Sequence, residues 1–321
     1  MTDILDSTAP HFSVSVVIPV YNSVATIPVL VAEVLKVLET MRGRYELILV
    51  NDGSRDRSWD AIAHAAEAHD CVRGIDLRRN YGQHNALLCG IREARFDVVI
   101  TLDDDLQHPP EEIPRLLAEL EEGHDLVYGV AKRGQHGPWR SLASWVTRQT
   151  LHRGLGAESA GNVSAFRAFR TPLREAFATY EGPFVSLDVL MSWATSLISY
   201  TRVRHRPRQV GTSHYGLLRL LTHAGNLVTG MSVVPLQFAT LIGFTFSLIG
   251  LVVLLFVVVR FLVEGVAVAG FTFLASIIAV FAGAQLFSLG IIGAYIARVH
   301  FHVMQRPAYT VRRRTPVPKR L

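Results

Sequence analysis

At 321 residues the chain is long enough for more than one domain, and its net charge of +5 is unevenly distributed. Residues 1–188 carry a net charge of −7 and residues 189–321 carry +12, because Glu264 is the only acidic residue of the second part. Cys71 and Cys89 provide neither a disulfide framework nor a metal-ligand spacing, which favours a reducing compartment. The second part is also strongly apolar, so its basic charge indicates a membrane surface and argues against nucleic acid as a partner.

Short apolar runs alternate with helix-like segments through the first half of the chain. The runs that predict strands are residues 13–19, 45–50, 72–77, 97–102 and 125–130. Helical periodicity is found in residues 26–41, 59–69, 83–94 and 111–122. This alternation predicts an α/β domain with a mostly parallel sheet that is covered on both faces.

Polar clusters lie where three of these strands are expected to end: Tyr21-Asn22, Asn51-Asp52-Gly53-Ser54, and Asp103 to Gln107. Parallel sheets bind ligands at the carboxyl ends of their strands, so we expect the clusters to converge. Residues two apart in an extended chain point the same way, so Asp103 and Asp105 could hold one hard divalent cation with the Gln107 amide oxygen. The alternative is an acidic turn before a helix, where Asp is common.

Two uncharged segments, residues 236–259 and 271–297, are long enough to cross a bilayer. Buried core helices are the alternative, but uninterrupted apolar runs of this length are rare in soluble domains. Basic residues follow the second segment, so the positive-inside tendency predicts a cytosolic C-terminus in a multi-pass protein of the inner (plasma) membrane. Two spans then keep the first domain in the cytosol, and residues 1–12 lack the apolar core of a signal peptide. Arg260, which follows the first span, is then expected on the far side of the membrane and is a minor exception to the positive-inside tendency.

A basic and aromatic stretch separates the first domain from the first span. Residues 217–228 predict an interfacial amphipathic helix, with an ordinary surface helix as the alternative. The chain is therefore expected to divide into an α/β domain (1–212), an interfacial region (213–232), a two-helix transmembrane hairpin (233–300) and a basic cytosolic tail (301–321).

Four motifs occur in a fixed order: Val16 to Asn22, Val50 to Ser54, Arg79 to Gln83, and Asp103 to Glu111. With the two spans, this set resembles the polyprenyl-phosphate glycosyltransferases of glycosyltransferase family 2, of the dolichol-phosphate mannose synthase-like and bacterial undecaprenyl-phosphate sugar transferase type. The resemblance covers about residues 13–310. It implies a GT-A fold and a metal-dependent hexosyltransferase that moves a sugar, with inversion, from a UDP- or GDP-hexose to a polyprenyl phosphate.

The resemblance also implies roles for the polar clusters. The nucleoside is expected on Pro19, Tyr21 and Asp52, with Asn22, Ser54 and Asp104 as further substrate contacts. Mg²⁺ or Mn²⁺ on the donor diphosphate is expected on Asp103, Asp105 and Gln107, where its charge offsets that of the leaving group. Asp104 points to the other face, so ribose or structural contacts are its expected role.

Arginines are expected on the phosphates, because the guanidinium fork can bond two oxygens. The resemblance implies Arg133 near the diphosphate or the acceptor phosphate and Arg167 on the acceptor side, with surface salt bridges as the alternative. The lipid phosphate and the membrane lipid are expected near the basic stretch, at Arg202, Arg206, Ser213, Tyr215 and Arg219.

The sequence departs from the family pattern at Ser23, Ala131 and Ala165, where the family often has Glu, Arg and Asp. The missing Asp has been treated as a catalytic base, and Asp188 is a candidate substitute, with a helix-start carboxylate as the equal alternative. A phosphate acceptor with a second pKa of about 6 is already ionised near neutral pH and needs no base.

Two rival functions remain open. A processive or secreting polysaccharide synthase usually carries more spans and a Gln-x-x-Arg-Trp motif, which this sequence lacks. A degenerate glycosyltransferase domain used as a membrane scaffold is disfavoured by the intact Asp103, Asp105 and Gln107. A homo-oligomer is also expected, and Gly283, Gly290 and Gly293 permit close packing of the second span.

Overall fold

The computed structural model describes residues 12–41, 43–131, 163–181, 186–206, 234–264, 270–304 and 307–316. The chain divides into two compact units. The first is formed by residues 1–215 together with residues 305–321, and the second by residues 216–304. The segment that follows the long apolar helices therefore belongs to the same unit as the N-terminal half.

The described part of the first unit contains a mixed sheet in the order β7-β5-β6-β4-β1-β2-β3-β8. Its strands are β1 (Val14–Val20), β2 (Tyr45–Asn51), β3 (Val72–Leu77), β4 (Val98–Thr101), β5 (Leu126–Ala131), β6 (Arg167–Arg170), β7 (Ile198–Val203) and β8 (Val311–Arg314). Strands β1 to β5 and β7 run parallel, whereas β6 and β8 are antiparallel to their neighbours. The predicted mostly parallel α/β sheet is confirmed.

Helices cover both faces of this sheet. They are α1 (Ile27–Leu38), α2 (Ser58–Ala68), α3 (Gln83–Glu93), α4 (Ile113–Glu121) and α6 (Leu187–Ala194), with 3₁₀ turns η1 (Pro110–Glu112) and η3 (Thr171–Phe177). One core cluster combines residues of α1, α2 and α4 with the sheet, and a second combines residues of α3, α6 and η3 with it. Alternate residues of β1 enter different clusters, because successive side chains of a strand point to opposite faces.

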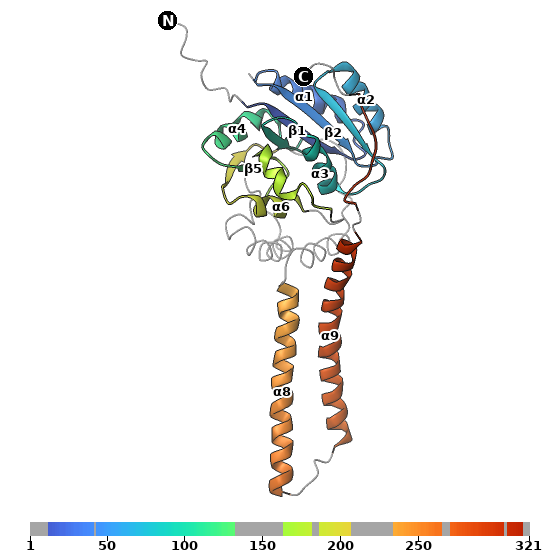
Figure 1. The fold of residues 1–321 in the computed structure, drawn as a ribbon, viewed down its shortest axis with the longest axis vertical. Coiled ribbons are helices and arrows are strands. Elements are labelled where there is room, and N and C mark those ends of the chain that lie inside the picture. The colour runs from blue at the N-terminus through green and yellow to red at the C-terminus, as the bar shows by residue number, and fades with distance from the viewer. Residues whose placement is uncertain are drawn as a thin grey trace. The chain divides into compact units, whose positions relative to one another are not determined.

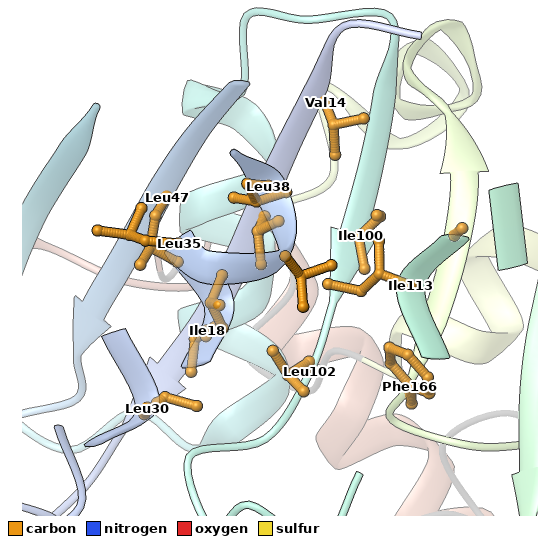
Figure 2. Close-up of a cluster of buried hydrophobic side chains, with 14 of the residues drawn as sticks. Val14, Ile18, Leu30, Leu35, Leu38, Leu47, Ile100, Leu102, Ile113 and Phe166 are labelled. Carbon is orange, nitrogen blue, oxygen red and sulfur yellow. The ribbon is translucent and has the colours of Figure 1, made fainter. Parts of the chain in front are cut away.

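Helix α1 illustrates how the pattern builds the core. The apolar residues of α1 recur at helical periodicity, which places Leu30, Leu35 and Leu38 on one face of the helix, and this face is buried. Figure 2 shows these side chains turned toward Ile18 and Leu47 of the sheet. Full burial of a leucine contributes about 1.5–3 kcal/mol, so these contacts hold the loop before α1 in place.

The C-terminal segment corrects one expectation. Residues 301–321 were expected to form a basic tail, but Val311–Arg314 is strand β8 and pairs antiparallel with β3. The dark red strand of Figure 1 is this segment. An edge strand exposes unpaired backbone groups, and β8 satisfies those of β3. Its arginines also meet acidic partners, because Arg313 bonds Asp76 and Arg314 bonds Glu93.

The second unit contains two long apolar helices, α8 (Val234–Glu264) and α9 (Phe271–Val303). Within them, Leu236–Arg260 and Val280–Ala297 are long and apolar enough to cross a membrane, with mean hydropathies of 2.8 and 1.7. The two helices pack together through Phe246 and Phe281, whose ring centroids lie 5.6 Å apart. Neither window is buried within the protein, so membrane association follows from their exposed apolar surface. The expected interfacial region, 213–232, lies outside the described residues.

Candidate active site

The loops after β1 and β4 meet at the point where the strand order reverses. Strand β1 lies between β2 and β4, so the chain leaves β1 toward one side and later returns to its other side. The Tyr21 amide donates to Asp104 Oδ2 at 3.1 Å, and the Ser23 hydroxyl donates to the same oxygen at 2.5 Å. Burial raises the pKa of Asp104, although these two hydrogen bonds oppose the shift. Asp104 thus joins two loops at the switch point, where open α/β sheets bind ligands.

The loops after β1 and β2 are also bonded to each other. Asn22 adopts a left-handed conformation (φ 53°), and its amide donates to Ser54 Oγ at 3.0 Å. Its side-chain oxygen accepts a hydrogen bond from the Arg55 amide at 2.8 Å. Asn22 and Ser54, both expected to contact substrate, therefore shape the loop that displays the exposed Tyr21. Their contact with substrate stays a prediction.

Asp52 connects the loop after β2 with the loop after β3. Its carboxylate accepts the amides of Tyr81 and Gly82 at 2.7 and 2.8 Å, and the residue is 3% exposed. Burial raises the pKa of Asp52 despite these bonds. Next to it, Gly53 has φ 62°, and a Cβ there would lie 2.3 Å from the Arg79 carbonyl carbon. Only glycine allows this close approach of the two backbones. Pro19, which precedes the loop that carries Tyr21, is buried within β1.

The acidic loop after β4 turns sharply at Leu106, which has φ 59° and is 3% exposed. Gln83 Nε2 donates to Asp103 Oδ1 at 2.5 Å, and the Gln107 amide donates to Asp105 Oδ1 at 3.1 Å. The Gln107 carbonyl accepts the Arg206 amide at 2.8 Å. A left-handed leucine is strained, so the buried side chain and these bonds must hold the turn.

The donor set of this loop fits a hard divalent cation. Asp103, Asp105 and Gln107 are half-buried and offer carboxylate and amide oxygens at the carboxyl end of a parallel strand. Mg²⁺ and Mn²⁺ prefer such oxygens, whereas softer metals prefer sulfur and imidazole. The residues present could therefore hold either ion, and that role stays a prediction.

A buried ion pair lies beside this loop. Arg167, 1% exposed, bonds the Asp188 carboxylate through Nη1 and donates from Nε to Thr101 Oγ1 at 3.1 Å. The Tyr128 hydroxyl donates to Asp188 Oδ1 at 3.2 Å, and burial raises the pKa of Tyr128 well above its usual value. Arg167 was expected on the acceptor side, and Asp188 was a candidate catalytic base. Here each charge neutralises the other, and neither residue is presented to solvent as a separate charge.

The basic residues expected near the lipid phosphate fall into two groups. Arg202 is exposed on β7, whereas Arg206 is shared between Glu33 at 3.0 Å and Glu111 at 3.1 Å. The charge of Arg206 is thus already compensated, and its contacts connect the residues that follow β7 to α1 and η1. The other expected phosphate and lipid contacts lie outside the described residues: Arg133, Ser213, Tyr215 and Arg219.

Comparisons with known proteins identify the family. The family profile "Glycosyl transferase family 2" matches residues 15–177, which include all three polar clusters. The chain is 38% identical over 301 residues to the undecaprenyl-phosphate 4-deoxy-4-formamido-L-arabinose transferase of Shewanella sediminis, covering 93% of this chain and 91% of that one. It is 36% identical to the protein of the same name in Pseudomonas paraeruginosa, over 94% and 89% of the two chains. The chain belongs to glycosyltransferase family 2.

The fold agrees with this assignment. The described structure resembles glucosyl-3-phosphoglycerate synthase of Mycobacterium tuberculosis, solved with Mn²⁺, UDP and phosphoglyceric acid. The match has a TM-score of 0.50 at 21% identity and covers 68% of this chain and 76% of the other. The expected GT-A fold of a family 2 glycosyltransferase is confirmed, in a chain that also carries the two long apolar helices α8 and α9.

Sequence reasoning about this family 2 enzyme missed several residues that hold the site. Ser23 was noted only as a departure, yet its hydroxyl bonds Asp104. Gln83 closes a family motif and bonds Asp103, so its position in that motif was an available signal. His108 stacks on Phe166 with ring centroids 5.4 Å apart, and burial and the neighbouring His205 lower its pKa to about 4, against the opposing effect of Asp105. The ring is therefore neutral near pH 7 and acts as packing beside the acidic loop.

Proposed function

We propose that this glycosyltransferase transfers 4-deoxy-4-formamido-L-arabinose to undecaprenyl phosphate. The observation that carries the proposal is the similarity to transferases of that name over 93% of this chain, which includes both the sheet unit and the two apolar helices. The sequence motifs led us to expect a hexose. The named sugar of the relatives is a pentose derivative, and the proposal follows the relatives.

The donor is proposed to be the UDP-linked sugar, with a GDP-linked sugar as the alternative that experiment must separate. Tyr21 and Asp52 lie on two loops that are bonded to one another through Asn22, a suitable frame for a nucleoside. Asp103, Asp105 and Gln107 would hold Mg²⁺ or Mn²⁺. When bound, that ion supplies positive charge that offsets the charge developing on the leaving diphosphate.

The proposed reaction is a single in-line displacement with inversion. The bond from the anomeric carbon to the donor diphosphate breaks, and its electron pair leaves with the diphosphate. A new bond forms from that carbon to an oxygen of the lipid phosphate. The acceptor phosphate is ionised near neutral pH, with a second pKa of about 6, so its oxygen is a nucleophile without a protein base.

The protein then contributes mainly positioning and electrostatics. Gln83 fixes the orientation of Asp103, and the Gln107 amide fixes Asp105. Asp188 is not required as a base in this proposal, because its carboxylate is bonded by Arg167 and Tyr128. The pair instead supports the start of α6 beside the reaction site.

The membrane topology is part of the proposal. Strand β8 follows α9, yet it pairs with β3, which precedes α8. Residues on both flanks of the helix pair therefore share one sheet, which supports a hairpin that crosses the inner membrane twice and returns to the same side. The basic residues of that sheet unit's last segment support the cytosolic side. A homo-oligomer remains a prediction.

The proposal is tested with the purified full chain in detergent and Mn²⁺. UDP-4-deoxy-4-formamido-L-arabinose, UDP-glucose and GDP-mannose are each supplied with undecaprenyl phosphate, and sugar is measured in the organic phase. We expect organic-extractable product from the first donor and little from the other two. Equal transfer from all donors, or label that stays water-soluble, would contradict the proposed donor or acceptor.

A further inference from the structure

A series of hydrogen bonds connects strand β8, which follows α9 in the chain, with the loops of Tyr21 and Asp52 that are proposed to bind the donor. Arg313 Nε donates to Asp76 Oδ2 at 2.9 Å, and Asn51 Nδ2 donates to Asp76 Oδ1 at 2.7 Å. Asp76 and Asn51 are 1% and 3% exposed, so this carboxylate is buried and each of its two oxygens accepts a hydrogen bond. Arg313 is thus linked through one carboxylate to the residue that precedes Asp52.

The hydrogen bond to Asp76 fixes the orientation of the Asn51 side-chain amide. Because its nitrogen donates to Asp76, its oxygen points the other way and accepts the Ser54 amide at 3.3 Å. Ser54 Oγ in turn accepts the Asn22 amide at 3.0 Å. The two loops that carry Asp52 and Tyr21 are therefore held in register by an amide whose direction is set by Asp76.

The same segment also fixes the loop after β3. The Arg78 amide donates to the Thr310 carbonyl at 2.9 Å, and Arg312 donates to the Arg78 carbonyl at 3.1 Å. That loop supplies the Tyr81 and Gly82 amides that bond Asp52. Residues 310–313 therefore reach the loop of Asp52 by two routes, one through the Asp76 side chain and one through the backbone of Arg78.

We propose that Arg313 is a positioning residue for the nucleotide, which acts through Asp76 and Asn51 and makes the post-membrane strand β8 part of the donor site. The inference rests on the proposed function, since it takes the loops of Tyr21 and Asp52 as the nucleotide site. Without Arg313, a buried carboxylate loses its cationic partner and the constraint on Asn51 weakens. Donor affinity falls, while the acceptor side is unchanged.

The strand offers a matched control. Arg314 lies next to Arg313 on β8, its side chain is 50% exposed against 53%, and it also bonds a carboxylate, that of Glu93. In the described structure Glu93 bonds Arg73, on the face of β3 away from Asn51. Arg313→Gln and Arg314→Gln each remove one ion pair from the same strand. Of the two arginines, only Arg313 bonds Asp76, the carboxylate that accepts the Asn51 side chain.

The test is the affinity of the full-length protein in detergent for UDP with Mn²⁺, measured by titration calorimetry, together with KM for each substrate. We expect Arg313→Gln to weaken UDP binding about tenfold, the effect of losing one hydrogen bond of typical net strength. Arg314→Gln is expected to bind UDP as the wild type does. The KM for undecaprenyl phosphate is expected to be unchanged in both.

A second variant separates positioning from simple loss of stability. Asp76→Asn removes the buried charge but keeps an oxygen that accepts the Asn51 amide, so Arg313→Gln with Asp76→Asn is expected to recover most of the UDP affinity. Equal UDP affinity of Arg313→Gln and Arg314→Gln would overturn this inference alone. Failure of the wild type to bind UDP would overturn the proposed donor, and this inference with it.

Discussion

The backbone amide of Tyr21 donates a hydrogen bond to the carboxylate of Asp104 at 3.1 Å, which joins the loop after β1 to the loop after β4. These loops carry the residues proposed for the nucleoside and for the metal. In the sequence Asp104 lies between Asp103 and Asp105, two of the three candidate metal ligands, so the middle carboxylate of the triplet fixes the frame from which its neighbours project.

The outer carboxylates of the triplet are predicted to be essential for transfer. We expect Asp103→Asn and Asp105→Asn each to lower kcat by at least about 100-fold, as the loss of charge stabilisation at a leaving group does. Initial rates with Mn²⁺ and with EDTA provide the measurement.

Asp104→Asn is the matched control for these variants. The hydrogen bonds from Tyr21 and Ser23 end on the same oxygen, Oδ2, and the amide oxygen of Asn can accept both. We expect this variant to remain active and metal-dependent. A loss as large as that of Asp105→Asn would mean that Asp104 is itself a ligand or a substrate contact.

Removal of the Ser23 hydroxyl is predicted to destabilise the switch point. Ser23→Ala leaves Asp104 with the Tyr21 amide and removes a bond that opposes the rise of its pKa. We expect a loss of about 1–3 kcal/mol in the free energy of unfolding, the cost of a polar group left under-satisfied. Chemical denaturation in detergent measures it, and an unchanged midpoint would refute the role of Ser23.

The Arg167–Asp188 pair is predicted to be structural. Asp188→Asn leaves a buried guanidinium without its counter-charge, so we expect about 3–5 kcal/mol lower stability. Turnover per folded molecule is expected to change little. The opposite pattern, intact stability with a kcat lowered about 100-fold or more, is what a general base would give and would restore Asp188 to the chemistry.

Burial of Asp52 predicts a particular dependence of stability on pH. Its folded pKa is raised above the usual 3.8, so the folded chain binds this proton more tightly than the unfolded chain. Ionised Asp52 therefore costs stability increasingly as the pH rises from 3.8 through the raised pKa, and by a constant amount above it. The Tm difference between Asp52→Asn and the wild type should move in favour of the variant over that range. A difference that is independent of pH would contradict the burial of this charge.

The topology is tested by labelling single introduced cysteines. Glu264→Cys, at the end of α8, is expected to react with an impermeant maleimide in intact cells. Arg312→Cys, on β8, is expected to react only after permeabilisation. Labelling of both positions from the same side would disprove the two-span hairpin.

Local patterns were sufficient for most of the fold. The strand before the acidic triplet and the periodic helix that became α1 were readable because burial imposes a period on neighbouring residues. Strand β8 was not readable, because its sequence, Val311 followed by three arginines, has the composition of a solvated tail. Its partners, Asp76 and the edge of β3, lie more than 200 residues earlier in the chain.

The candidate site was predicted in position more than in detail. The convergence of the loops containing Tyr21, Asp52 and Asp103 follows from the parallel sheet, so it could be expected from strand ends alone. The hydrogen-bond and ion-pair partners of individual carboxylates could not be predicted in this way. Asp52 is bonded by backbone amides of another loop, and Asp188 is paired with Arg167, and such pairings depend on tertiary approach that no local pattern encodes.

The most direct test of the central claim is mass spectrometry of the lipid fraction after reaction of the full chain with UDP-4-deoxy-4-formamido-L-arabinose, Mn²⁺ and undecaprenyl phosphate. We predict a species with the mass of undecaprenyl phosphate carrying one 4-deoxy-4-formamido-arabinosyl group, formed by the wild type and formed at an initial rate at least about 100-fold lower with Asp105→Asn. Sugar found only in water-soluble or polymeric material, or formation of the lipid product by Asp105→Asn at the wild-type rate, would contradict the proposed function.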